Sequence, residues 1–390
     1  MELGLLYLLL PVAAFSGWLI GRNGTNQEQR PRKDFNADYF KGLNYLLNEQ
    51  ADKAIEVFVH MLDIDSETVE THFALGNLFL RRGEVDRAIR IHQNLIARPT
   101  LTRTQRQQAL FELGKDYLRA GLLDRAETLF IQAAENSELA PLALWHLLEV
   151  YQLEKEWQKA IVVAQRLKGI KSFKDINPLI AHFLCEEAEE SLRNKHTPEA
   201  MRLVKKALDE DKDCVRASLL EAQMEIARQD YKKAIRSLLR IEYQDAAFLS
   251  EILKPLRESY NHLGTDDELL SYMEGVIQQR KGGSSFVLLY AELIGERNGR
   301  DAALSFLLYY LNNQPSLRVM KKVIEWRLQS HPLSESSDLV QLNNIIGARL
   351  EGKPAYQCRN CGFTARMLNW QCPTCKQWNT VKPLPVLEDE

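Results

Sequence analysis

Phe73–His92 reads FALGNLFLRRGEVDRAIRIH, and Phe111–Phe130 reads FELGKDYLRAGLLDRAETLF. The two stretches share a glycine in the first half, an aromatic residue three positions later and an alanine in the second half. Two further copies flank them, and the four copies align at Gly42, Tyr45 and Ala54; Gly76, Phe79 and Ala88; Gly114, Tyr117 and Ala126; and Leu148, Tyr151 and Ala160. Successive copies lie 34 residues apart, with four extra residues before the third. A pattern that returns four times in register indicates a repeat protein.

A period of 34 residues with small side chains at two fixed sites is typical of the tetratricopeptide repeat (TPR). Each repeat is expected to form two antiparallel helices whose backbones approach closely at the small residues. One helix pair cannot bury its apolar face alone, so neighbouring pairs must stack into a superhelix. Weaker matches continue to about Leu350 and predict eight or nine pairs over residues 35–351. The predicted fold is therefore all-α, a TPR superhelical solenoid.

Composition limits the classes of function. The chain has 390 residues, of which 45% are hydrophobic and 26% charged, as expected for a folded protein of two or more units. Its 50 basic and 53 acidic side chains give a net charge of −3. A large nucleic-acid surface needs a basic stripe, so we expect no nucleic-acid partner. The sequence contains no phosphate-binding glycine loop, zinc-protease, serine-hydrolase or dinucleotide motif, and we predict that the protein is not an enzyme.

The first residues predict a membrane anchor. Leu3–Ile20 is uncharged and mostly apolar, and as a helix it would span about 27 Å, enough for a hydrocarbon core. A signal peptide would carry basic residues before the apolar run, whereas here they follow it. We therefore expect a single-pass transmembrane helix over residues 1–21 and a flexible tether over 22–34. The basic residues on its C-terminal side predict an N-terminus outside the membrane and a cytoplasmic array.

One row of residues on the array is a candidate partner-binding surface. Three residues before the first aligned site, each copy carries an aromatic residue: Tyr39, Phe73, Phe111 and Trp145. Polar residues stand near the same face one or two turns farther on: Asn77, Lys115, Glu149, Arg81 and Arg119. In one interpretation the rings pack between neighbouring helices. In the other they form an aromatic ladder that holds a partner peptide, because aromatic anchors dominate many interfaces. The sequence leaves both interpretations open.

Four cysteines near the C-terminus form two pairs, each with two residues between its members: Cys358 and Cys361, then Cys372 and Cys375. Two such pairs joined by a short loop predict a tetrahedral thiolate site for one metal ion. The surrounding segment, residues 354–382, holds too little apolar mass to fold without the metal. We expect Phe363, Trp370 and Trp378 to pack it against the last helices. An acidic tail, residues 383–390, follows.

The two cysteine knuckles resemble those of rubredoxins, which hold one iron ion. The first knuckle continues with Gly362 and the second contains Pro373, as in that family, but Lys376 replaces the second glycine. Only ten residues separate Cys361 from Cys372, whereas rubredoxins carry a longer insert that shields the iron from water. We therefore favour a zinc ion in a structural, zinc-ribbon-like knuckle, and iron remains the alternative.

The order of anchor, TPR array and rubredoxin-like knuckle resembles the lipopolysaccharide assembly protein B family of Gram-negative bacteria. The resemblance covers Leu3–Ile20, residues 35 to about 350, and Cys358–Cys375. It implies an inner-membrane adaptor that restrains lipopolysaccharide synthesis. The implied partners are the membrane protease FtsH, the lipid A deacetylase that it degrades, and a membrane-embedded sensor of lipopolysaccharide. Self-association is left open.

Two other classes of function compete with the adaptor. A rubredoxin-like centre on a membrane scaffold would suit an electron carrier, and stoichiometric iron with a reversible redox wave would favour it. A zinc-ribbon nucleic-acid binder would use Arg359, Arg366 and Lys376. The acidic residues Glu388–Glu390 weigh against that second alternative, because they repel phosphates.

Overall fold

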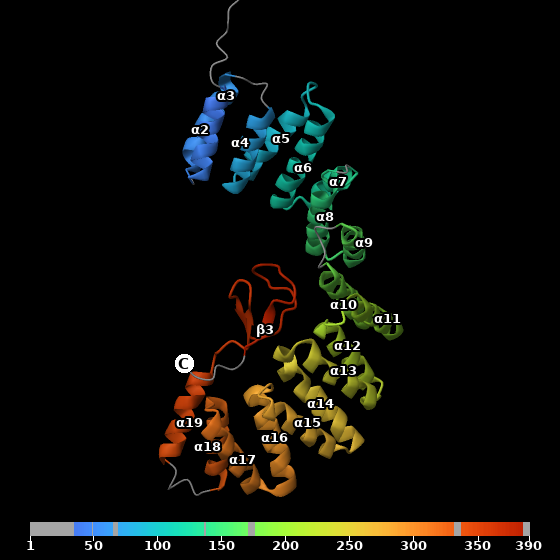
Figure 1. The fold of residues 1–390 in the computed structure, drawn as a ribbon, viewed down its shortest axis with the longest axis vertical. Coiled ribbons are helices and arrows are strands. Elements are labelled where there is room, and N and C mark those ends of the chain that lie inside the picture. The colour runs from blue at the N-terminus through green and yellow to red at the C-terminus, as the bar shows by residue number, and fades with distance from the viewer. Residues whose placement is uncertain are drawn as a thin grey trace, which may run out of the picture. The chain divides into compact units, whose positions relative to one another are not determined.

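The computed structural model describes residues 35–48, 50–64, 69–135, 138–170, 176–330 and 337–384. They belong to two compact units, residues 1–150 and 151–390, which are described one at a time (Figure 1). The predicted anchor and tether, residues 1–34, and the tail after residue 384 lie outside the described residues. Among the helices that are described, none combines the length and the hydropathy needed to cross a membrane.

The first unit consists of helices joined by short turns. They are α2 (Phe35–Leu47), α3 (Ala51–Ile64), α4 (Val69–Arg81), α5 (Val85–Ile96), α6 (Arg103–Arg119), α7 (Leu123–Ala133) and α8 (Ala140–Glu154), whose last turn belongs to the second unit. Helix α2 packs on α3, α4 on α5, and α6 on α7. This pairing of neighbours is the TPR arrangement that the 34-residue period predicts.

Close approach at glycine explains why the repeat needs small residues. In the first three repeats the aligned glycine faces a ring sixteen residues later: Gly42 faces Phe58, Gly76 faces His92 and Gly114 faces Phe130. A Cβ atom would lie 2.6 Å from the Phe58 ring at the first glycine and 2.8 Å from the Phe130 ring at the third. The rings of Phe58 and Phe130 are fully buried. In each of these helix pairs, one ring therefore packs directly against the backbone of a glycine.

Local sequence also sets where helices begin and end. Helix α6 begins at a capping box, in which the Gln105 N–H donates to Thr102 Oγ1 at 3.2 Å and the Gln105 side chain accepts from the Thr102 N–H. Helices α4 and α6 are followed by Gly83 and Gly121, whose φ angles are 79° and 74°. Glycine adopts this left-handed conformation without steric cost, which permits the tight turn into the next helix.

The second unit continues the helices and ends in a small sheet. The helices are α9 (Trp157–Lys168), α10 (Asn177–Arg193), α11 (Thr197–Glu210), α12 (Val215–Ala227), α13 (Tyr231–Gln244), the 3₁₀ turn η2 (Ala246–Phe248), α14 (Leu249–Leu263), α15 (Asp266–Gln278), α16 (Gly283–Asn298), α17 (Arg300–Asn313), α18 (Leu317–Ser330) and α19 (Ser337–Leu350). The strands are β1 (Tyr356–Cys358), β2 (Thr364–Ala365) and β3 (Val381–Pro383), in the antiparallel order β2-β1-β3.

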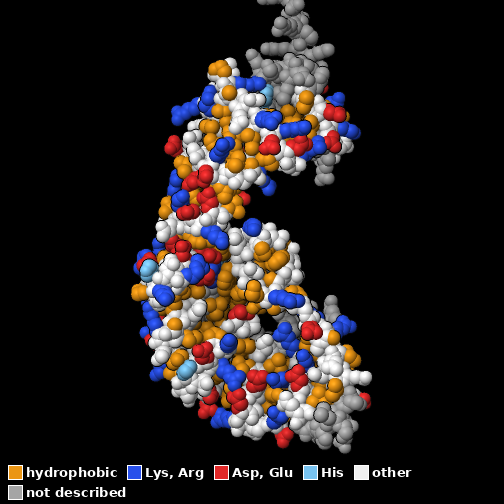
Figure 2. Space-filling model, turned by 180° about the vertical axis from the view of Figure 1, so that it is seen from behind, with side chains coloured by type: hydrophobic (Ala, Val, Ile, Leu, Met, Phe, Trp, Pro, Cys, Tyr) orange, Lys and Arg blue, Asp and Glu red, His pale blue; other side chains and the backbone are white. Residues whose placement is uncertain are grey.

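One hydrophobic core of this unit joins helices from α12 to α16. Phe248, Leu256, Met273 and Phe286 are buried at its centre. Trp370, from the C-terminal segment, packs against the same cluster. The segment that carries the cysteines therefore shares a core with the array. Figure 2 shows basic and acidic side chains interspersed over the visible face of each unit, in keeping with the near-neutral net charge.

Candidate metal centre and its seat on the repeats

The four cysteines of the two knuckles converge on one point. Their sulfur atoms all lie within 4.8 Å of one another. The closest pairs are Cys358 Sγ and Cys375 Sγ at 3.7 Å, and Cys361 Sγ and Cys372 Sγ at 3.6 Å. Zinc–sulfur bonds of about 2.3 Å in a tetrahedron place the sulfurs about 3.8 Å apart. The four cysteines are thus positioned to bind one tetrahedral metal ion, and the arrangement suits zinc and iron alike.

The two knuckles have the same backbone geometry although their sequences differ. The Gly362 N–H donates to the Cys358 carbonyl at 3.0 Å, and the Lys376 N–H donates to the Cys372 carbonyl at 2.9 Å. Gly362 has a φ of 77° and Lys376 a φ of 59°. The left-handed turn is therefore kept at the second knuckle, where a lysine adopts it in place of the glycine expected from rubredoxins.

The protein favours the thiolate form at one of the ligands. Burial raises the pKa of the Cys358 thiol, but the hydrogen bond with the Thr380 hydroxyl and those from the N–H groups of Cys361 and Asn360 outweigh it and lower that pKa to about 6. The Cys358 sulfur and Thr380 Oγ1 are 3.3 Å apart. Because the thiolate is the form that binds metal, this ligand is prepared for it near neutral pH.

Around the knuckles there is only a small apolar core. Cys358, Cys372 and Val381 are its buried members, and Tyr356 and Phe363 are among the partly buried side chains that pack on them. Such a core is too small to hold a fold of this size without a metal ion. The segment from Tyr356 to Pro383, called the metal module below, therefore depends on its metal and on the helices beneath it.

Two tryptophans of the metal module lie on the repeats. The Trp378 Nε1–H donates to Gln152 Oε1, near the end of α8, at 2.8 Å. The Trp378 ring stacks on His182 of α10, with 5.2 Å between centroids. The Trp370 ring stacks on Phe248 of η2 at 5.4 Å. Burial of large rings together with a satisfied indole N–H fixes the position of the module on this unit.

Arg216 of α12 lies between these rings. Its guanidinium carbon is 5.9 Å from the centroid of Trp370 and 5.9 Å from that of Trp378. The side chain is 3% exposed and forms ion pairs with Glu186 at 2.9 Å and Glu189 at 2.8 Å. The two carboxylates of α10 and the two ring faces together compensate for the desolvation of this charge.

Two further contacts join the metal module to helices farther along the array. The Lys382 ammonium contacts Asp245 Oδ2 at 2.7 Å and lies 4.6 Å from the centroid of Phe248. The Tyr356 hydroxyl donates to Glu251 Oε1 of α14 at 2.9 Å. The metal module thus bridges residues from the end of α8 to the first turn of α14 (Figure 1).

The expectation that Phe363, Trp370 and Trp378 pack on the last helices is wrong. The two tryptophans contact α10, α12 and η2, in the middle of the array, and Phe363 packs inside the module itself. After α19 the chain returns to helices more than a hundred residues earlier in the sequence. The seat residues Gln152, His182 and Arg216 carry no pattern that distinguishes them in the sequence, and sequence reasoning missed them.

His182 is the titratable group at the centre of the seat. Burial first, then the positive charges of Arg216 and Lys382, lower the pKa of its imidazole to about 3. Its side chain is 3% exposed. A neutral imidazole can stack on Trp378 next to the guanidinium, whereas a protonated one would add a third positive charge to the same buried site.

The aromatic ladder candidates differ in exposure. Phe111 is 4% exposed and packs edge-on against Phe130 at 5.9 Å between centroids. Tyr39 and Phe73 are half-buried and lie 6.1 Å from the rings of Phe58 and His92, respectively. Trp145 is 42% exposed. Packing between helices therefore accounts for the first three rings, and Trp145 retains the largest surface for a partner.

The polar candidates near the ladder are engaged within their own helices or exposed. Lys115 forms an ion pair with Glu112 at 2.6 Å, and Glu149 lies 3.3 Å from His146. Asn77 is half-buried, and Arg81 and Arg119 are exposed. In the first unit these side chains do not converge into a cluster of the kind formed by the cysteines.

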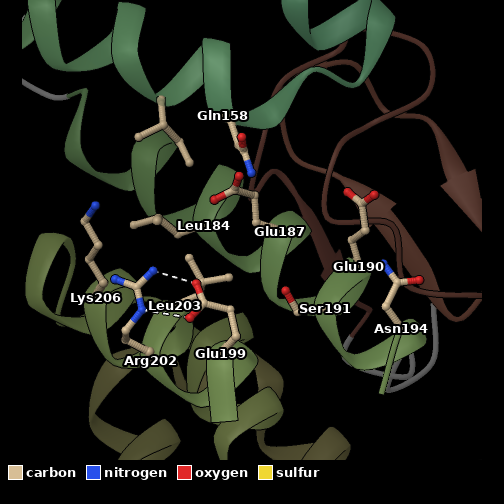
Figure 3. Close-up of a pocket in the computed structure, with 11 residues that line it drawn as sticks. Gln158, Leu184, Glu187, Glu190, Ser191, Asn194, Glu199, Arg202, Leu203 and Lys206 are labelled. Carbon is tan, nitrogen blue, oxygen red and sulfur yellow. Dashed lines mark hydrogen bonds and ion pairs between the residues drawn. The ribbon is translucent and has the colours of Figure 1, made fainter. Parts of the chain in front are cut away.

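A polar cavity of about 450 Å³ lies between α9, α10 and α11 (Figure 3). The carboxylates of Glu187, Glu190 and Glu199 line it together with Arg202 and Lys206. Glu199 and Arg202 pair at 2.9 Å, and burial raises the pKa of Glu187. No sequence pattern indicated this cavity, because its polar lining residues are ordinary positions on amphipathic helices.

Comparison with known proteins follows the same division of the chain. Family models described as tetratricopeptide repeats match residues 71–107, 111–174 and 185–248. A model described as a rubredoxin metal binding domain matches residues 356–383. The crystal structure of MamA aligns with 44% of this chain and 94% of its own at 22% identity and a TM-score of 0.34, a likeness from which nothing about function is drawn.

Curated relatives match nearly the whole chain. Lipopolysaccharide assembly protein B of Escherichia coli (strain K12) is 40% identical over 389 residues, covering 99% of both chains. Lipopolysaccharide assembly protein B of Haemophilus influenzae is 36% identical over 393 residues, covering 97% of this chain and 98% of its own. The chain therefore belongs to the lipopolysaccharide assembly protein B family.

Proposed function

We propose that the protein is an inner-membrane-anchored cytoplasmic TPR adaptor that regulates lipopolysaccharide synthesis. In this role it promotes degradation of the committing lipid A deacetylase by the membrane protease FtsH, and a membrane-embedded lipopolysaccharide sensor restrains it. The observation that carries the proposal is the similarity, over almost the full length, to relatives named lipopolysaccharide assembly protein B. The TPR array supports it, because stacked helix pairs present extended surfaces suited to protein partners.

The mechanism that we propose is proximity. A tether over residues 22–34 would behave as a flexible chain with an end-to-end distance of about 20 Å. An array held that close to the bilayer raises the effective concentration of a bound substrate near a protease in the same membrane. Neither chemistry nor a bound nucleotide is needed for this effect, in line with the expectation that the protein is not an enzyme.

In this proposal the metal module has a structural task. It contacts residues from Gln152 to Glu251 and so ties α8, α10, α12 and α14 to one common body. Helix pairs of a solenoid otherwise contact only their neighbours, and their relative angles can drift. Loss of the metal would free these helices from one another and change the surface that the array offers to a partner.

The test is the lifetime of the deacetylase in cells of a Gram-negative host that lacks its own family member. We expect rapid turnover when the full chain is supplied, and slow turnover with Cys358→Ser, which removes one metal ligand. Cys185→Ala is the matched control, since Cys185 is a buried thiol of α10 that is not part of the metal site. A deacetylase lifetime that is the same with and without the full chain would contradict the proposed function.

The location is tested separately. A chain that lacks residues 1–21 should fractionate with the soluble proteins and should leave the deacetylase stable, because the array is no longer held beside the protease. The same truncated chain fused to an unrelated single-pass anchor should restore turnover if proximity is the mechanism. Failure of the fusion, with the truncated chain still folded, would mean that the native anchor itself contacts a partner.

A further inference from the structure

A second cavity lies where the chain leaves α19 and enters the metal module. Its volume is about 360 Å³. First-turn residues of three helices line one side, namely Ser250 of α14, Ser285 of α16 and Arg318 of α18. Lys353, Tyr356 and Leu384 line the other side, before and within the metal module. We call it the junction pocket.

The junction pocket has an excess of positive charge. Among the described residues, no carboxylate forms an ion pair with Arg318 or Lys353. The one carboxylate in the lining, Glu251, accepts the hydroxyl hydrogen of Tyr356. Partial burial lowers the pKa of Arg318. Three helix N-termini beside two cations give the pocket an affinity for an anion.

The remaining lining is apolar. Leu350, Pro354, Ala355, Pro383 and Leu384 form this part of the wall. A small inorganic anion would leave these side chains in contact with water. The cavity is better filled by a peptide that brings apolar side chains and acidic groups together, because each part of the lining then has its complement.

A segment with that composition begins at the rim of the pocket. Leu384 belongs to the lining, and the chain continues as Pro385-Val-Leu-Glu-Asp-Glu390, outside the described residues. It supplies two aliphatic side chains and three side-chain carboxylates. Six residues reach at most about 20 Å, so an attached segment of this length is never far from Arg318 and Lys353.

We propose that the junction pocket is a binding site for an acidic, apolar peptide, and that its occupant is this chain's own C-terminal segment, residues 385–390. Val386 and Leu387 contact the apolar wall, and the acidic residues pair with Arg318 and Lys353. The short connection keeps the segment at an effective concentration of about millimolar, so even weak binding fills the pocket. The contact joins the end of the metal module to α16 and α18, helices that its tryptophans do not reach.

Binding of a labelled peptide tests the proposal. The probe is the peptide Pro-Val-Leu-Glu-Asp-Glu, added to the full chain and to a chain that ends at Leu384. We expect the shortened chain to bind it, with affinity that falls as salt is added. The full chain should bind it at least about tenfold more weakly, because the attached segment competes. The neutral peptide Pro-Val-Leu-Gln-Asn-Gln amide should not bind.

Variants of the shortened chain locate the site. Arg318→Ala and Lys353→Ala should each weaken binding of the acidic peptide about tenfold, the effect of losing one charge-assisted contact. Arg300→Ala is the matched control, an exposed arginine at the start of α17 that does not line the pocket. Circular dichroism and bound zinc confirm that each variant is folded.

Three outcomes would overturn the proposal. The first is no binding of the acidic peptide to the folded, shortened chain. The second is equal binding by Arg318→Ala, Lys353→Ala and Arg300→Ala, which would place the peptide elsewhere. The third is equal binding by the full and shortened chains, which would mean that the native segment is not the occupant and that the pocket is open to a partner's acidic peptide or to a second copy.

Discussion

The first three repeats and the stretch from α10 to α14 hold their helices together by different means. In the repeats, each contact joins a glycine to a buried ring sixteen residues later, which is phenylalanine in the first and third repeats and His92 in the second. Between α10 and α14, Arg216, His182 and Phe248 pack beneath two tryptophans that come from the far end of the chain. The glycine–ring contacts join residues that are close in sequence and need no other part of the chain. The contacts of the two tryptophans exist only while the metal module is folded. The five tests below separate the two.

Metal removal should separate the two regions most completely. The binding free energy of a structural thiolate-bound zinc ion is also folding free energy, on the order of 10 kcal/mol. Chelation should therefore unfold the metal module, and amide hydrogens of α12 and η2 should exchange faster. Exchange in α4 and α6 should stay as it was. A chelated protein whose metal module remains protected, with all metal shown to be gone, would contradict the proposed dependence.

Arg216→Ala should have the next largest effect. The change leaves Glu186 and Glu189 without their cation and both tryptophan rings without their central contact. Breaking a buried ion pair on one side costs about 3–5 kcal/mol. Urea unfolding followed in the second unit measures it, with Arg228→Ala as a control on the exposed end of the same helix. Similar losses in both variants would show that the rings do not depend on the guanidinium.

Gly114→Ala tests the local arrangement. The new Cβ would lie 2.8 Å from the Phe130 ring, so the helix pair must move apart, at a cost of about 1–3 kcal/mol. Gly275→Ala in α15 is the matched control, because nothing lies within 4 Å of a Cβ there. Alanine should stabilise that helix by up to about 1 kcal/mol. Thermal unfolding of the two variants should therefore shift in opposite directions.

The pH dependence of the seat follows from His182. Its pKa is about 3 in the folded protein and near 6.5 when unfolded, so the unfolded state takes up a proton first as the pH falls. The stabilisation is present above pH 6.5 and is lost progressively toward pH 3. Between pH 7.5 and 5.5 we expect a loss of roughly 1.4 kcal/mol.

The pH experiment must retain the charged side chains next to His182. Arg216 and Lys382 are the charged groups that act on it, so both side chains are retained. His182→Phe should remove this part of the pH dependence while keeping a ring against Trp378. Bound metal is measured at each pH. If the His182→Phe protein loses as much stability on acidification as the parent, another group is responsible.

The sequence predicted those features whose residues lie close together along the chain. The glycine and its ring are sixteen residues apart, and the two cysteine knuckles are separated by a ten-residue loop, so both patterns are visible along the chain. Gln152 and Trp378 are 226 residues apart, and only the folded array brings them to 2.8 Å. The seat of the metal module therefore had no signal in the sequence, and the junction pocket, built from three helix ends, had none either.

The aromatic ladder shows a second limit of prediction from sequence. Its spacing is regular, but regular spacing does not tell a ring that faces a neighbouring helix from one that faces a partner. Phe111 and Trp145 occupy the same register, yet one is 4% and the other 42% exposed. Phe111 packs against the rings of Phe130 and His146, and a one-dimensional pattern does not contain such contacts.

The smallest effect concerns the two knuckles themselves. Both turns are left-handed, but the first uses Gly362 and the second uses Lys376 at a φ of 59°. A residue with a Cβ pays roughly 1 kcal/mol for this conformation, so Lys376→Gly should tighten metal binding by up to about fivefold, and Gly362→Lys should weaken it by a similar factor. Competition with a zinc chelator measures both. Weaker metal binding by Lys376→Gly would contradict this prediction. It would mean that the lysine charge stabilises the negatively charged thiolate cluster by more than the left-handed turn costs.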